Sequence, residues 1–133
     1  MNEILFKTEN GKEYTIYIDS HSLKQIMRSM AILVEDDAKN KPDVNTLYFF
    51  FPFVNFLHAF VKYCVAQKIV PCRFDKADPE WIIGALSSWQ ILCNKFVEKR
   101  GDDAPEFCKK RWADRDEFKT FSGLFADAEY YIS

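Results

Sequence analysis

The chain has 133 residues, of which 48% are apolar and 17% aromatic, with only four glycines and five prolines. That length suits one domain, and that composition excludes a disordered chain. The net charge of −2, from 18 basic and 20 acidic residues, argues against a nucleic-acid-binding protein, because such proteins normally carry a basic face.

The N-terminal region predicts a hairpin followed by a helix. Two runs of β-branched and aromatic residues, at about 3–8 and 13–18, flank an Asn-Gly pair, the strongest short signal for a β-hairpin. The next element, a helix, has Asp19, Ser20 or Ser22 available as its N-cap. Its apolar residues recur at helical spacing on one face: Leu23, Ile26, Met27 and Met30.

After an acidic loop, the run Leu47–Phe51 predicts a third strand. The run is continuously apolar and of strand length, which is typical of a strand buried on both faces. Pro52 cannot donate a hydrogen bond to a neighbouring strand, so we expect the strand to end there. Asn55 is then placed to cap a helix whose apolar face is Phe56, Leu57, Phe60, Val61 and Cys64.

The clearest helix in the sequence is expected between Asp78 and Gly101. Asp78 is placed as the N-cap, Pro79 takes the first helical position, and Gly101 comes after two basic residues at the end. A second capped segment, 102–125, is rich in aromatic residues. The predicted order is therefore two strands, a helix, a strand and then three or four helices.

That ordered set resembles the Skp-type adaptors and elongin C, which are small proteins of the POZ (BTB) fold. The matching pieces are "ILFKTENGKEYTI", "SLKQIM", "EDD", "PFVN" and "FLHAFVKYC", which together cover residues 3–68. The resemblance implies an α/β (α+β) POZ/BTB-like fold, in which a small three-stranded sheet is covered by helices. It also implies a POZ-like core at 1–101 and a helical extension at 102–133 within the same structural unit.

The C-terminal half fits that family in two ways. In the first, favoured register, the helix after Asp78 is the family's central helix, with Asn94 at its characteristic Asn, and residues 104–125 are a shortened F-box-binding tail. In the second, residues 111–133 are the central helix, as in elongin C, and 69–105 are an insertion.

The resemblance also implies two sets of binding residues. Those expected to face a cullin scaffold are Phe53, Val54, Asn55 and Asn94. Those expected to bind an F-box-like receptor are Phe107, Cys108, Arg111, Trp112, Phe118 and Phe121. The implied function is a non-enzymatic adaptor that links a substrate receptor to a cullin-type ubiquitin ligase. The alternative is a POZ-like module that self-associates or belongs to another stable complex.

The sequence shows no catalytic constellation. Four cysteines are too widely spaced for a zinc or redox motif, and no glycine-rich phosphate loop is present. A nucleophile at Cys64 or Cys108, with His58 near Cys64, is a third and weaker alternative. We therefore expect no cofactor or metal, protein partners without nucleic acid or membrane, reduced cysteines, and a cytoplasmic or nuclear location. No signal peptide is expected, because Glu3 and Lys7 interrupt the first apolar run, and no membrane span is expected, because Pro52 and Asn55 break the longest one.

Overall fold

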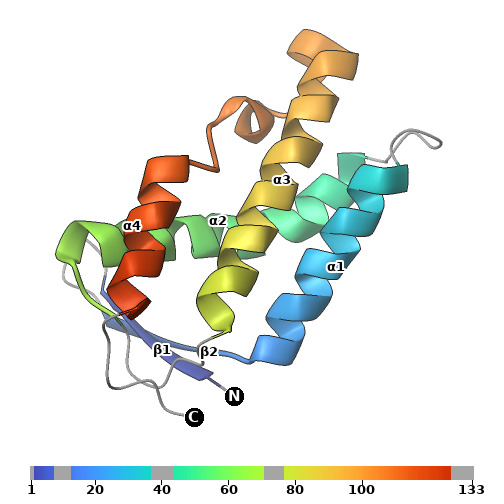
Figure 1. The fold of residues 1–133 in the computed structure, drawn as a ribbon. Helices are drawn as coiled ribbons and strands as arrows, with labels where there is room; N and C mark the ends of the chain where they lie inside the picture. Colours follow the sequence, from blue (N-terminus) through green and yellow to red (C-terminus); the bar gives the residue numbers. More distant parts are fainter. Residues whose placement is uncertain (1, 8–12, 37–43, 71–76, 127–133) are drawn as a thin grey trace.

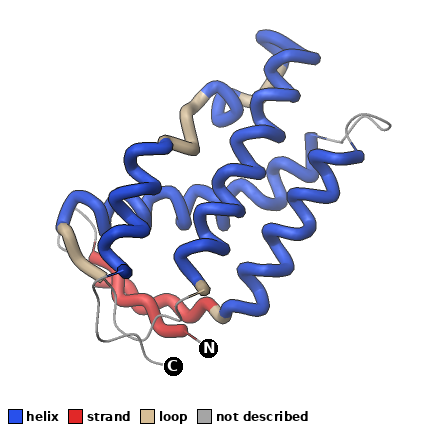
Figure 2. Tube along the Cα trace, in the orientation of Figure 1, coloured by secondary structure: helices blue, strands red, loops and turns tan. Residues whose placement is uncertain are grey.

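A computed structural model describes residues 2–7, 13–36, 44–70 and 77–126. Two strands come first, and helices make up most of the other described residues (Figures 1 and 2). The elements, in chain order, are β1 (Asn2–Lys7), β2 (Glu13–Ile18), α1 (Ser20–Asp36), α2 (Val44–Gln67), α3 (Asp78–Arg100), the 3-10 helices η1 (Gly101–Asp103) and η2 (Glu106–Lys109), and α4 (Arg115–Ala126).

The expected POZ fold with a three-stranded sheet is wrong. The strands β1 and β2 lie close to the positions expected for a hairpin and pair antiparallel, from Asn2 opposite Ile18 to Lys7 opposite Glu13. The expected third strand at 47–51 is instead part of α2. Without that strand, the described residues form only a two-stranded sheet, and the described part of the chain is predominantly helical.

α2 is helical through Pro52 because its buried residues recur at helical spacing. Each lies three or four positions from another member of the set, so together they form one continuous face: Leu47, Phe50, Val54, Leu57, His58, Phe60, Val61 and Cys64. A proline inside a helix costs about 3 kcal/mol, since it removes one backbone hydrogen bond. Pro52 itself is exposed, so packing on the opposite face of α2 offsets that cost.

The helices form two layers. α1, α3 and α4 lie side by side, and α2 crosses behind them at a steep angle (Figure 1). α1 packs chiefly on α3, whereas α2 packs on α3 and α4. The hairpin lies beneath the lower ends of the front helices in this view. The core lies where α2 crosses the front layer, and its largest fully buried side chains include Trp89, Trp112 and Phe60.

α1 begins at an acidic cap and approaches α3 closely. The Asp19 carboxylate accepts hydrogen bonds from the Ser22 backbone N–H at 2.7 Å and from its hydroxyl at 3.1 Å, so Asp19 is the N-cap. Further along, Gly84 of α3 faces Met27 of α1. A Cβ atom placed on Gly84 would stand 2.5 Å from the Met27 Sδ atom, so only glycine fits this spacing without a rearrangement.

α3 has almost the bounds that the sequence predicted, with a different N-cap. The helix starts at Asp78 and its N-cap is Ala77, whereas Asp78 is completely buried. Gly101 ends the helix with a φ of 56°, a left-handed backbone conformation that favours glycine.

The segment after α3 belongs to the same core as the rest of the described chain. Its buried side chains are Ala104, Cys108, Trp112, Phe118, Phe121 and Phe125. Gln90 of α3 fastens this segment, since its Oε1 atom accepts hydrogen bonds from the backbone N–H groups of Trp112 (2.5 Å) and Ala113 (3.1 Å). Residues 102–126 therefore pack against α2 and α3 as part of the core, and we call them the C-terminal layer.

Candidate functional site

Large apolar side chains are exposed at five described positions, and two of them line one groove. The five are Ile32 (56% exposed), Tyr48 (55%), Phe49 (78%), Ile69 (39%) and Ile91 (46%). Ile32 and Phe49 face the space between α1 and the first turns of α2, and Tyr48 adjoins Phe49 on α2. Exposed apolar residues gathered in a concavity are typical of a binding surface.

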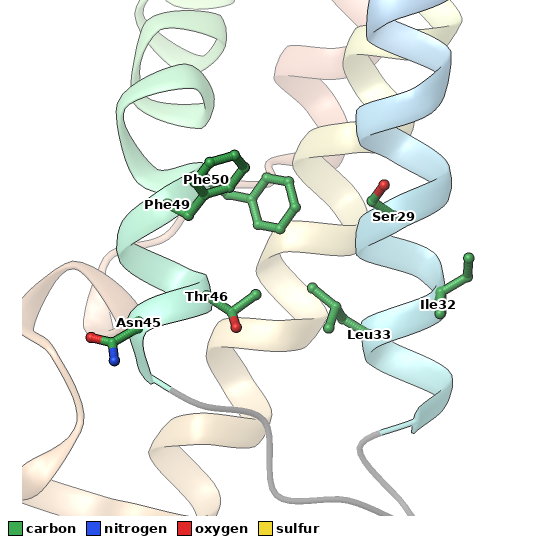
Figure 3. Close-up of a pocket in the computed structure, with 7 residues that line it drawn as sticks. All are labelled: Ser29, Ile32, Leu33, Asn45, Thr46, Phe49 and Phe50. Carbon is green, nitrogen blue, oxygen red and sulfur yellow. The ribbon is translucent and has the colours of Figure 1, made fainter.

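The groove has a volume of about 550 Å³ and is built by two helices. Ser29, Ile32 and Leu33 come from α1, and Asn45, Thr46, Phe49 and Phe50 come from α2 (Figure 3). We call this set the α1–α2 groove. In Figure 3 the phenylalanine rings lie on the side of α2 that faces α1, and Leu33 of α1 points toward α2.

Among the described residues, no element fills the space between the two walls of this groove. α1 packs chiefly on α3, whereas α2 packs on α3 and α4, so the two helices diverge. Phe50 is only 9% exposed and anchors α2 to the core. Its neighbour Phe49 is turned by about 100° around the helix axis and projects outward, with the two rings edge-to-face at 5.2 Å.

The described residues that line the α1–α2 groove carry no charge. None of these seven residues is ionisable, and their polar side-chain groups are the hydroxyls of Ser29 and Thr46 and the amide of Asn45. Close by, Pro52 cannot donate the helical hydrogen bond to the carbonyl of Tyr48 four residues earlier. The groove thus joins apolar walls to a few hydrogen-bonding groups, which is the composition of the centre of a protein interface.

The residues expected to face a cullin lie outside this groove. Val54 is fully buried in the core and Phe53 is half-buried, while Asn55 is exposed on α2. Asn94 is exposed on α3, where its Oδ1 atom accepts a hydrogen bond of 2.8 Å from Gln90. Of the four, Val54 has no surface to offer a partner in this conformation.

Most of the residues expected to bind a receptor are packed inside the chain. Cys108, Trp112 and Phe121 are at most 2% exposed, and Phe118 is 9% exposed. Phe107 is half-buried. The four buried positions form the inner face of the C-terminal layer, and a receptor could reach their side chains only if that layer moved.

The other two residues expected to bind a receptor, Phe107 and Arg111, also make contacts within the chain. The Phe107 ring stacks on Phe51 with centroids 4.4 Å apart, and exposed Arg111 lies 3.9 Å from the Asp114 carboxylate. The aromatic surplus that suggested a receptor groove is therefore used to pack α2, α3 and the C-terminal segment together. A receptor-binding role for these residues stays an untested prediction.

The candidate nucleophile Cys64 sits in an unreactive environment. Burial raises the pKa of its thiol to about 12, so Cys64 is protonated at neutral pH. Burial also lowers the pKa of His58 to about 4, helped by the charges of Lys110 and Lys62, and the ring packs edge-to-face on Trp112 at 5.0 Å. Across the described ranges, no three His, Cys, Asp or Glu side chains are grouped to hold a metal ion.

The α1–α2 groove could not be expected from a chain in which Leu47–Phe51 is a strand. A strand places Phe49 and Phe51 on the same face, whereas a helix places Leu47, Phe50 and Val54 together and turns Phe49 outward. The helical spacing of the buried residues is the signal in the sequence that points to the groove, and Pro52 obscures it.

The helix α2 also changes the expectation about membrane segments. Pro52 was expected to interrupt the apolar run, yet the helix is continuous, and among the described residues it alone is long and apolar enough to cross a membrane, with a mean hydropathy of 1.4. The core helix of a globular protein meets the same criterion, and 39% of this window is buried here. The finding is therefore weak support for a membrane segment.

Comparison with known proteins adds no relative. No protein-family model, no curated protein and no solved structure matches the chain. The function must accordingly be argued from the groove itself.

Proposed function

We propose that the chain is a non-catalytic interaction protein that binds an apolar helix of a protein partner in the α1–α2 groove. The observation that carries this proposal is the uncharged groove with Phe49 exposed at its wall. Recognition of a helix in a groove works by apolar anchors at helical spacing, which enter pockets between the helices of the receptor. The groove is long enough along α1 and α2 to take more than one such anchor, since its lining spans residues 29–33 and 45–50.

The proposal keeps the class of function that the sequence suggested and gives up the named partners. The cullin scaffold and the F-box-like receptor were inferred from a POZ fold, and that fold is wrong. Without it, the residues at 53–55 and 107–121 have no family geometry to support those roles. Partner binding without catalysis remains the proposal, and it now rests on different residues.

A protein helix suits the groove better than a lipid surface does. A membrane favours a convex apolar face flanked by basic residues, whereas this site is concave and its polar lining groups are uncharged. Lys62 is a basic residue further along α2, and its Nζ atom lies 3.5 Å from the Glu117 carboxylate, so its charge is paired within the chain.

The test is selection of helical peptides from a display library on the immobilised protein, followed by affinity measurements with two variants. Phe49→Glu removes the exposed anchor, and because Phe49 is 78% exposed the fold should be preserved. Ile91→Glu is the matched control, since Ile91 is an exposed apolar residue of α3 outside the groove. Loss of a hot-spot side chain costs about 2 kcal/mol, or about 30-fold in Kd.

The expected result is a set of peptides with apolar residues three or four positions apart, whose binding Phe49→Glu weakens about 30-fold and Ile91→Glu leaves unchanged. Peptides that bind both variants equally would place the interaction elsewhere and refute the proposal. So would binding of phosphatidylcholine vesicles that depends on Phe49, because the groove would then be a lipid-contacting surface.

A further inference from the structure

A second pocket lies where η2 and the residues after it pack on α3. It has a volume of about 390 Å³ and shares no described lining residue with the α1–α2 groove. The described residues that line it come from the second half of α3 and from the segment 108–111: Gln90, Asn94, Val97, Cys108, Lys109, Lys110 and Arg111. A pocket of this size suits a small molecule, since ligand pockets in proteins commonly measure about 300 to 1,000 Å³.

Three consecutive lining residues are cationic, and all three are exposed. The Lys109 ammonium lies 3.1 Å from the Glu106 carboxylate, and the Arg111 guanidinium lies 3.9 Å from the Asp114 carboxylate. Both acidic residues lie outside the pocket lining. Ion pairs between exposed side chains are weak, so an anion in the pocket can compete for these two cations.

Lys110 is the cation whose position is fixed by an aromatic ring. Its ammonium lies 4.6 Å from the centre of the Trp112 ring, and this ring is buried in the core. A cation–π contact holds the ammonium without neutralising its charge. Because none of the described lining residues is acidic, the pocket favours an anion over a cation.

A chain of hydrogen bonds fixes the orientation of the two amides in the pocket. The Gln90 Oε1 atom accepts from the backbone N–H groups of Trp112 and Ala113, so Oε1 and Nε2 of this amide are assigned. The Gln90 Nε2 atom then donates to the Asn94 Oδ1 atom at 2.8 Å. The Asn94 side chain is exposed, so its Nδ2 group remains a donor at the surface of the pocket.

We propose that this pocket binds the phosphoryl group of a small organic phosphate. The groups that would hold it are all donors, namely the Asn94 Nδ2 group and the three cationic side chains at 109–111. A phosphoryl group has three acceptor oxygens and carries up to two negative charges, whereas a carboxylate has two oxygens and one charge. The phosphoryl group therefore satisfies more of these donors, and Arg and Lys bind it by charge-assisted hydrogen bonds. The organic part would contact Val97 and Cys108, which are the apolar lining residues.

The surroundings of the pocket favour a small molecule over a phosphorylated segment of a protein. A protein segment also needs apolar surface beside the phosphate site, because the centre of a protein interface is apolar. In the part of the chain that the structure describes, five large apolar side chains are exposed, and none of them lines this pocket. The proposal is thus independent of the partner helix proposed for the α1–α2 groove.

The test is an NMR titration of the isotope-labelled full-length chain with phenyl phosphate, and in parallel with inorganic phosphate, benzoate and phenol. We expect phenyl phosphate to shift the amide signals of residues 90–97 and 108–111. It should bind about tenfold more tightly than benzoate, which has one charge and one oxygen fewer. Phenol, which has no charge, should cause no shift.

Two pairs of variants test the residues. Asn94→Asp keeps the oxygen that accepts from Gln90 and places an anionic oxygen where the Nδ2 donor was, so phenyl phosphate should bind at least about thirtyfold more weakly. Asn55→Asp is the matched control, because it makes the same change at an exposed position of α2 outside the pocket. Lys110→Gln should weaken binding about tenfold, whereas Lys119→Gln, an exposed position of α4, should leave it unchanged.

The spectrum of each variant without ligand shows whether it is folded as the wild type is, and Lys110→Gln decides if Asn94→Asp disturbs the fold. No shifts with phenyl phosphate, or shifts confined to other residues, would overturn the site. Equal weakening by Asn94→Asp and Asn55→Asp would overturn it too, since net charge alone would then explain the effect. Benzoate that binds as tightly as phenyl phosphate would overturn the choice of a phosphoryl group. A phosphoserine peptide that binds where phenyl phosphate does not would assign the pocket to a protein partner and overturn the small molecule.

Discussion

His58 is a buried side chain that couples stability to pH. Its ring is 3% exposed and lies against Trp112, and its pKa is lowered from 6.5 to about 4 in the folded chain. Between these values the unfolded chain binds a proton that the folded chain does not bind. The stability should therefore fall as the pH drops from about 6.5 toward 4, by up to about 3 kcal/mol.

The measurement is urea unfolding of the wild type and His58→Leu between pH 7.5 and 4.5. In the variant, the loss of stability over this range should be much smaller. His21→Gln is the control, because His21 is exposed and its replacement should keep the wild-type slope. The pKa values of Asp19 and Asp114 are lowered from 3.8, so these carboxylates affect the stability mainly below about pH 3.8, outside the measured range. An unchanged slope in His58→Leu would contradict the assignment.

Gln90 is a second residue whose replacement should change the stability, because its side chain joins α3 to the C-terminal segment by hydrogen bonds. Its Oε1 atom serves the backbone N–H groups of Trp112 and Ala113 at once, and its amide donates to Asn94. Gln90→Leu leaves two partly buried donors without their acceptor, and we expect the free energy of unfolding to fall by about 2 kcal/mol. Gln90→Glu keeps the acceptor oxygen and should retain most of the stability. Equal stabilities of the two variants would show that these hydrogen bonds do not fasten the segment.

At the scale of the elements, α2 decides the fold. If residues 47–51 were a strand that ends at Pro52, replacing the proline would not stabilise the chain. In a continuous helix, Pro52→Ala restores a backbone hydrogen bond at an exposed position. It should raise the free energy of unfolding by about 1 to 3 kcal/mol. Chemical denaturation of the two proteins measures this directly, and a neutral or destabilising change would favour the strand.

The elements show which part of the fold the sequence could predict. The hairpin positions, the start of α1 at one of three candidate caps (Asp19, which is used, Ser20 or Ser22) and the helix that ends at Gly101 depend on local signals, namely turn residues, caps and helical spacing. α2 could not be recognised in the same way, because the local cost of Pro52 is offset by packing on α3 and α4, which are distant in the sequence. The wrong strand then led to the wrong fold class and removed Phe49 from consideration as a site residue.

The burial of most of the expected receptor-binding residues could not be predicted for a related reason. Trp112 and Phe121 have the residue types of interface hot spots, and a sequence does not tell whether an aromatic packs within its own chain or on a partner. Here both are buried among Trp89 and Phe60, at ring distances of 6.0 Å and 6.2 Å. Burial by α2 and α3 is a tertiary property that no spacing along 105–125 encodes.

At the scale of the whole molecule, the C-terminal layer should be indispensable. Deletion of residues 104–133 would uncover Trp89, Phe60 and their neighbours in the core. Removing even one buried Trp or Phe side chain costs about 3 to 5 kcal/mol, and the total stability of a domain is typically about 5 to 15 kcal/mol. We therefore expect the truncated chain to lack a cooperative unfolding transition by circular dichroism. A truncated chain that is folded and unfolds cooperatively would contradict this expectation and support a core at 1–101 that folds without the extension at 102–133.

The contact of Gly84 with Met27 has a consequence for the whole molecule. One hydrogen atom in place of a methyl group sets the distance between α1 and α3, and α1 supplies one wall of the α1–α2 groove. In Gly84→Ala the flexible thioether of Met27 can move aside, but a branched side chain such as that of valine would push α1 away from α3. Under the proposed function, such a substitution would widen or narrow the α1–α2 groove and change partner affinity, although residue 84 itself does not line the groove.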